Sequence, residues 1–102
     1  MLTLPIKKKW FDMIASGEKL EEYRNITPRY STMFRNASNE EGCFWCVLRN
    51  GYSLKSPSIK VFVSVSIGNG KPEWGAVENM DYFVLKILEK ERCRSNVLPT
   101  CF

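Results

Sequence analysis

The sequence predicts a small α+β fold that is mainly β, with one helix between its first two strands. Every second residue from Ile59 to Ile67 is Ile or Val, which is typical of a strand with one fully apolar face. Trp10, Met13 and Ile14 recur at helical spacing in the stretch from Lys7 to Ser16. These two periodicities, together with several shorter strand patterns, indicate a sheet accompanied by little helix.

The motif between Gly17 and Arg24 gathers opposite charges where the backbone must turn. Gly17 follows the last residue of the helical pattern, and a glycine there can take the left-handed conformation that ends a helix. A strand is expected from Leu20. Alternation then places Leu20, Glu22 and Arg24 on one face and Glu21 and Tyr23 on the other. Lys19 lies in the turn, where its side chain is expected to be free to swing to either face.

The remaining elements follow from turn residues and apolar patterns. Asn50-Gly51 is a strong turn signal after an expected strand. In chain order we expect a first strand at Leu2 to Ile6, a turn or short helix around Pro28 to Phe34, an exposed loop at Arg35 to Gly42, strands at Phe44 to Arg49 and Ile59 to Ile67, a loop at Gly68 to Gly75, a last strand at Tyr82 to Leu88 and a charged tail from Glu89. An antiparallel, partly closed barrel fits these strands because it removes exposed edges, although other β/α orders fit the periodicity equally well.

Composition limits the protein to ordinary globular classes. With 102 residues, of which 44% are hydrophobic and 25% charged, the chain can form one domain with a single core. No segment is long and apolar enough to be a membrane span or the core of a signal peptide, so we expect a cytoplasmic location and no membrane partner. The net charge of +4 fits an anionic partner such as RNA, although many basic proteins bind none.

The chain contains no histidine, which excludes a Ser-His-Asp triad, a histidine-pair ribonuclease mechanism and any histidine-ligated metal. Cys43 and Cys46 form a C-x-x-C, but Cys93 and Cys101 do not form a second close pair. A strand through Phe44 would also point Cys43 and Cys46 to opposite faces. We therefore expect reduced thiols, no metal site and no cofactor.

The spacing Gly17-x-Lys19-x-x-Glu22-x-Arg24, after a strand and a helix, resembles the signature of the ASCH domain family. The likeness continues through 47–52, 67–75 and 82–88, and covers roughly residues 2–89. The resemblance implies a PUA-like β-barrel. It also implies a division of the chain into an ASCH-like domain, residues 1–89, and a C-terminal tail of uncertain order, residues 90–102.

The resemblance also implies a binding cleft. In ASCH-like domains the residues that match Lys19, Glu22 and Arg24 line a cleft beside the barrel, proposed to take RNA or a nucleotide. Arg24 would form two parallel hydrogen bonds to a phosphate or base edge, Glu22 would accept from an exocyclic amine, and Lys19 would supply a mobile positive charge. On spacing alone, without the resemblance, a surface ion pair is the favoured explanation for Glu22 and Arg24.

Aromatic side chains complete the expected cleft, since splayed bases stack on them. The candidates are Trp10, Tyr23, Tyr52 and Trp74; Trp74 is favoured because it lies in a loop rich in glycine and proline, where packing would not explain a large ring. The expected ligand-binding residues are therefore Lys19, Glu22, Arg24, Arg49 and Trp74, and the expected ligand is single-stranded RNA or a nucleotide-like molecule.

An enzyme is the alternative. Some ASCH-like proteins are amidohydrolases that deacetylate N4-acetylcytidine with a lysine, a threonine nucleophile and a glutamate. Lys19 matches that lysine and Glu73 is a candidate for the glutamate, but Glu22 stands where the threonine would be, so the covalent mechanism cannot be carried over. A small amidohydrolase or nuclease acting on modified nucleosides or RNA would have to use Lys19 with Glu22 or Glu73 and a water molecule. Binding is favoured over catalysis, and catalysis stays open.

Overall fold

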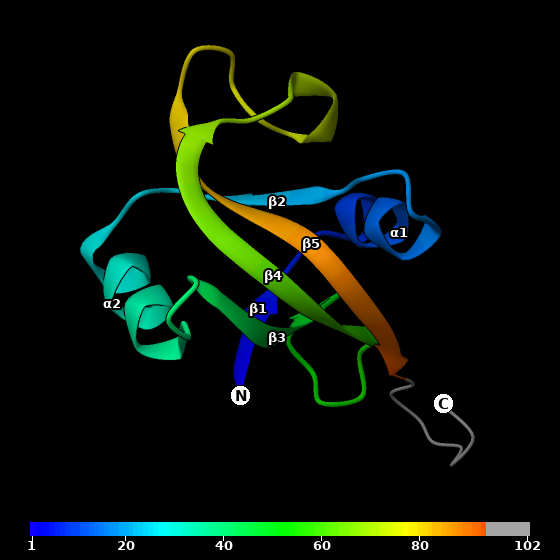
Figure 1. Cartoon of the computed structure of the whole chain (residues 1–102). Helices are drawn as coiled ribbons and strands as arrows, with labels where there is room; N and C mark the ends of the chain where they lie inside the picture. Colours follow the sequence, from blue (N-terminus) through cyan, green and yellow to red (C-terminus); the bar gives the residue numbers. More distant parts are fainter. Residues whose placement is uncertain (94–102) are drawn as a thin grey trace.

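The computed structural model describes residues 1–93 and has a curled five-stranded sheet, shaped like a half-barrel, with two α-helices (Figure 1). In chain order the elements are β1 (Leu2–Pro5), α1 (Lys8–Ser16), β2 (Glu21–Arg24), α2 (Pro28–Ala37), β3 (Cys43–Arg49), β4 (Ser58–Asn69), the 3-10 helix η1 (Pro72–Trp74) and β5 (Asp81–Cys93). The mainly β class and the helix between the first two strands are confirmed. Membership of the PUA-like barrels stays a prediction.

The strand order across the sheet is β1-β3-β4-β5-β2, so β1 and β2 are its two edges. β1 pairs with β3 in parallel, whereas the other neighbouring strands are antiparallel. The expectation of an antiparallel sheet is therefore wrong for β1. The physical reason is the connection: α1, β2 and α2 carry the chain back before β3 begins, and such a long crossover permits parallel pairing.

β4 and β5 are the longest strands and form a curved ribbon across the molecule (Figure 1). The apolar alternation of 59–67 is confirmed as part of β4. From the sequence we expected the last strand to end at Leu88, but β5 continues to Cys93 and pairs there with Ser58. The pairing register between β4 and β5 shifts between Phe62 and Val63, and the two strands stay paired on both sides of this irregularity. Residues 94–102, the rest of the expected tail, lie outside the described residues.

The helices begin and end at recognisable residues. Gly17 ends α1 with φ of 90°, and its N–H donates to Ile14 O. Thr27 caps α2 by accepting from the backbone N–H of Tyr30, and Pro28 occupies the first turn, where a missing N–H costs nothing. The sequence predicted a turn or short helix here and a loop from Arg35; instead α2 runs for ten residues to Ala37.

The core lies on the concave face of the sheet. Side chains from the middle strands meet one buried residue from each helix, Ile14 of α1 and Phe34 of α2. Phe34 stacks on Phe44 and meets Phe83 edge-on, with ring centroids 5.6 and 5.2 Å apart, so aromatic packing fixes α2 against the sheet. Within residues 1–93 no helix is long and apolar enough to cross a membrane.

Candidate functional site

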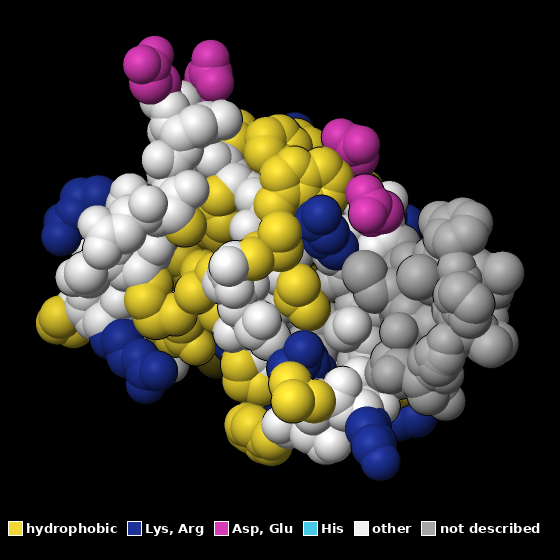
Figure 2. Space-filling view, turned by 90° about the horizontal axis from the view of Figure 1, so that it is seen from below, with side chains coloured by type: hydrophobic (Ala, Val, Ile, Leu, Met, Phe, Trp, Pro, Cys, Tyr) yellow, Lys and Arg dark blue, Asp and Glu magenta, His cyan; other side chains and the backbone are white. Residues whose placement is uncertain are grey.

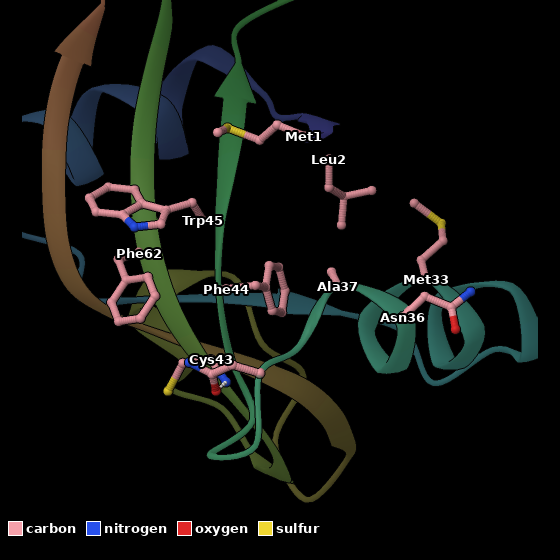
Figure 3. A pocket seen from close by; sticks show the side chains of 10 residues that line it. Met1, Leu2, Met33, Asn36, Ala37, Cys43, Phe44, Trp45 and Phe62 are labelled. Carbon is pink, nitrogen blue, oxygen red and sulfur yellow. Dashed lines mark hydrogen bonds between the residues drawn. The ribbon is translucent and has the colours of Figure 1, made fainter.

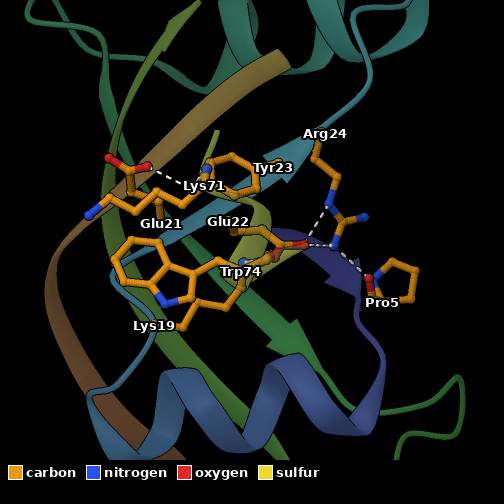
Figure 4. Close-up of polar contacts among 8 residues, drawn as sticks. All are labelled: Pro5, Lys19, Glu21, Glu22, Tyr23, Arg24, Lys71 and Trp74. Atoms are coloured by element: carbon orange, nitrogen blue, oxygen red, sulfur yellow. Dashed lines mark hydrogen bonds and ion pairs between the residues drawn. The ribbon is translucent and has the colours of Figure 1, made fainter. Parts of the chain in front are cut away.

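Lys19, Glu22 and Arg24 form one connected group on β2 and the turn before it (Figure 4). Lys19 Nζ lies 3.4 Å from Glu22 Oε1, and Arg24 donates to Glu22 Oε2 from Nε at 3.1 Å and from Nη2 at 2.8 Å. Glu22 and Arg24 thus share a strand face, as alternation predicted. Two cations and one carboxylate leave the group with a net charge of +1.

Lys19 is not the mobile charge that its turn position suggested. Its side chain is only 1% exposed, and Nζ donates to the backbone carbonyl of Trp74 at 2.8 Å. The ammonium also lies over the rings of Tyr23 and Trp10, at 4.7 and 5.3 Å from their centroids. Burial lowers the pKa of Lys19 from its usual value, while the nearby Glu22 carboxylate opposes that shift. The lysine is therefore held in place by Trp74, Glu22 and the two aromatic rings.

Arg24 has most of its hydrogen-bonding capacity occupied within the protein. Besides its two bonds to Glu22, Nη2 donates to Pro5 O at 2.6 Å and Nη1 to the hydroxyl of Tyr30 at 3.1 Å. A guanidinium has five N–H groups, so one N–H on Nη1 remains. The Nε and Nη2 edge of the guanidinium, which would form two parallel hydrogen bonds to a phosphate or base edge, faces Glu22 in this arrangement.

The bond from Arg24 to Pro5 joins the two edges of the half-barrel. Arg24 ends β2, Pro5 ends β1, and these strands are not hydrogen-bonded neighbours in the sheet. Open sheet edges leave unpaired backbone groups, and a side chain that reaches across satisfies one of them. The charged group therefore has a structural part to play at the seam between β1 and β2, in addition to any ligand.

A hollow of about 350 Å³ opens at this seam, and we call it the seam hollow. It is lined by Pro5, Ile6 and Lys7 after β1, Trp10 of α1, Glu22, Tyr23 and Arg24 of β2, and Asn25, Thr27 and Tyr30 at the start of α2. Its volume lies within the roughly 300–1,000 Å³ of small-ligand pockets. Glu22 and Arg24 line this hollow as expected, whereas Lys19 is not among its lining residues.

A loop of residues 70–76, which we call the strap, packs against the other side of Tyr23. The Tyr23 hydroxyl accepts from the Lys71 N–H at 2.9 Å and donates to Glu21 Oε1 at 2.7 Å. Burial raises the pKa of the Tyr23 phenol. Trp74 is half-buried in the strap, with the ammonium of Lys71 4.7 Å from its ring centroid, and it does not line the seam hollow. Glu73 is exposed.

Arg49, Cys43 and Cys46 lie apart from the seam hollow. Arg49 ends β3, and its carbonyl accepts from the Ile6 N–H at 2.9 Å, but its side chain does not line the seam hollow. Cys43 is partly exposed while Cys46 is buried, in keeping with opposite strand faces. Burial raises the pKa of the Cys46 thiol to about 12, and no cluster of three metal-ligating side chains occurs among the described side chains of residues 1–91.

A larger hollow of about 710 Å³ lies between the start of β1, α2 and β3 (Figure 3). Its lining includes Met1, Leu2, Met33, Phe44 and Trp45, and no charged side chain. Figure 2 shows hydrophobic side chains gathered on the lower face of the molecule, with Lys and Arg side chains around them. An uncharged, apolar lining does not suit an anionic ligand, so we take the seam hollow as the candidate site.

Several residues of the seam hollow were absent from the expected site. Lys7, Asn25, Thr27 and Tyr30 lie outside the motif, and Tyr30 comes from a helix that the sequence indicated only as a turn. A polar segment with an N-capping threonine was the available signal for α2. Nothing in the spacing showed that α2 would dock beside Arg24.

Comparison of the chain with protein-family models, with curated proteins and with solved structures gave no match. Membership of the ASCH family therefore stays a prediction from the motif. The function of the protein has to be inferred from the geometry and charges of the seam hollow.

Proposed function

We propose that this protein binds a nucleotide or single-stranded RNA in the seam hollow. The observation that carries the proposal is a hollow that combines aromatic walls, Trp10 and Tyr30, with a carboxylate and a guanidinium, Glu22 and Arg24. Aromatic side chains stack on bases, and a paired acceptor and donor can read a base edge. The motif's resemblance to ASCH domains points in the same direction.

The remaining hydrogen-bonding capacity of the charged pair supports a base rather than a phosphate at this position. A carboxylate has about four lone-pair sites, and those of Glu22 already face two N–H groups of Arg24 and the ammonium of Lys19. About one acceptor site on Glu22 and one N–H on Arg24 are left. An exocyclic amine next to a ring nitrogen or carbonyl on a base offers the matching donor and acceptor.

Lys7 is suited to hold the phosphate of such a ligand. Of three consecutive lysines, Lys8 pairs with Asp12 at 2.6 Å and Lys9 lies 4.7 Å from the centroid of the Trp10 ring. Lys7 is exposed, lines the seam hollow, and its ammonium has no partner within residues 1–93. A lysine ammonium is a mobile point charge that binds phosphate without a fixed geometry.

The test is a salt titration of binding to a short single-stranded RNA. We expect the logarithm of the affinity to fall by about 0.7 per log unit of salt for each phosphate neutralised. Lys7→Gln should flatten that slope by about one such step, while Lys8→Gln, which makes the same change of charge outside the hollow, should flatten it less. No binding at low salt would contradict the proposal.

The catalytic alternative has less support from the geometry. Neither Lys19 nor Glu73 lines the seam hollow. Lys19 is buried and donates to Trp74 O, and Glu73 is exposed on η1. We expect no detectable deacetylation of N4-acetylcytidine. Turnover that is lost in Glu73→Gln, but kept in the exposed control Glu78→Gln, would favour an enzyme instead.

A further inference from the structure

A second hollow, of about 460 Å³, adjoins the seam hollow, and we call it the loop hollow. The two hollows share Pro5, Ile6, Lys7 and Arg24 in their linings. The loop hollow adds Asn50, Gly51 and Tyr52, from the loop between β3 and β4. The end of β1 brings this loop close, because Pro5 pairs with Arg49 in the sheet. The shared residues make the hollows neighbours on one surface.

Tyr52 is an aromatic ring that internal packing does not explain. It is 90% exposed, and within residues 1–93 its ring and hydroxyl make no hydrogen bond or ring contact. The loop that carries Tyr52 is nevertheless braced. The N–H of Asn50 donates to Pro57 O at 2.9 Å, and Ser56 packs so close to Gly51 that a Cβ there would lie 2.7 Å from Ser56 Oγ. A braced loop presents the ring at little further cost in conformational entropy.

We propose that the loop hollow receives a second, adjacent nucleotide of a single strand, with its base stacked on Tyr52 and the linking phosphate held at Lys7. The inference rests on the proposed function, since it extends the strand whose first base occupies the seam hollow. It makes the ligand a chain of at least two nucleotides rather than a free nucleotide.

The charges at the junction fit a phosphodiester. Lys7 lines both hollows, and among the side chains of residues 1–91 its ammonium has no partner. A phosphodiester joins the sugars of neighbouring nucleotides, so with one base in each hollow it passes the boundary between the hollows, which Lys7 lines. Stacking on an aromatic side chain contributes about 1–3 kcal/mol per base and tolerates any base.

The experiment compares nucleoside 5′-monophosphates with the matching 5′-phosphorylated homodinucleotides of RNA, by calorimetric titration at constant salt. We expect the preferred dinucleotide to bind about 5- to 150-fold more tightly than its mononucleotide, which is the stacking range expressed as an affinity ratio. Tyr52→Ala should remove that gain and leave the mononucleotide affinity unchanged. Tyr52→Phe should keep the gain because stacking needs the ring and not the hydroxyl.

Leu54→Ala is the matched control, because Leu54 is 82% exposed in the same loop and lines neither hollow. It should keep the full dinucleotide gain. The inference is overturned if the dinucleotide binds no more tightly than the mononucleotide, or if Tyr52→Ala matches Leu54→Ala. In those cases mononucleotide binding would leave the proposed function standing. If neither probe binds at low salt, the proposed function and the inference both fail.

Discussion

Glu22 is the residue on which the candidate site depends most. It is 7% exposed and faces cations on both sides, Lys19 at 3.4 Å and Arg24 at 2.8 Å. A buried ion pair gains little over a hydrophobic replacement, but removing one partner leaves the other charge buried and uncompensated. Glu22 therefore neutralises Lys19, which is 1% exposed and out of reach of water, and pairs with Arg24 beside the seam hollow.

The first prediction is that Glu22→Gln lowers the free energy of unfolding at neutral pH by about 3–5 kcal/mol, because it leaves Lys19 without its neutralising charge. Urea denaturation measures the change. Glu18→Gln is the control: Glu18 is exposed one residue before Lys19, and its substitution should change stability by no more than about 0.5 kcal/mol. Equal stability of the two variants would show that Lys19 does not need Glu22.

The strap is the element that covers the inner side of the charged group. Its backbone accepts a hydrogen bond from Lys19 at Trp74 O and donates one to Tyr23 from Lys71 N. Gly75 has φ of 104°, and a Cβ there would lie 3.0 Å from the Trp10 ring. The glycine thus satisfies two demands at once, a left-handed backbone and close approach to an aromatic face.

The second prediction compares two glycines in neighbouring segments. Gly75→Ala should destabilise the fold by about 1–2 kcal/mol through its left-handed backbone, with a further loss from contact with Trp10. Gly68→Ala is the control, since a Cβ on Gly68 in β4 would meet nothing within 4 Å, and it should be neutral or slightly stabilising. Thermal unfolding of both variants measures the difference. A Gly75→Ala protein as stable as Gly68→Ala would mean that the strap shifts without cost.

At the scale of the whole molecule, the half-barrel leaves two sheet edges that must be joined or covered. Arg24 joins them through Pro5 O and also binds Tyr30 of α2, so one side chain links β2, β1 and the second helix. The seam hollow lies at this junction. The gap between the two sheet edges must therefore be bridged by side chains, and it is also where the proposed ligand would bind.

The third prediction concerns this junction. Arg24→Met should speed amide hydrogen exchange in β1 and β2 by on the order of tenfold or more, because a hydrogen bond to a charged group contributes about 1.5–3 kcal/mol. Arg29→Met, at an exposed position of α2, should leave exchange in both strands unchanged. Identical exchange in the two variants would contradict a bridging role for Arg24.

Local chemistry in the sequence determined much of this protein. The alternation of 59–67 predicted β4, the helical spacing with Gly17 predicted the end of α1, and strand alternation put Glu22 and Arg24 on one face. Each of these depends on neighbours along the chain, whose spacing is set by the geometry of a helix or strand. These three features can therefore be predicted without knowing which distant residues they contact.

Only the tertiary structure decided what surrounds the charged motif. The burial of Lys19 depends on Trp74, 55 residues away, and the orientation of Arg24 depends on Pro5 and on Tyr30 of a helix packed through Phe34. The parallel pairing of β1 with β3, and the nearness of the Tyr52 loop to the seam that this pairing brings about, likewise depend on strands distant in the chain. Such contacts are set by packing between elements distant in the chain, and the spacing of residues along one segment does not encode them.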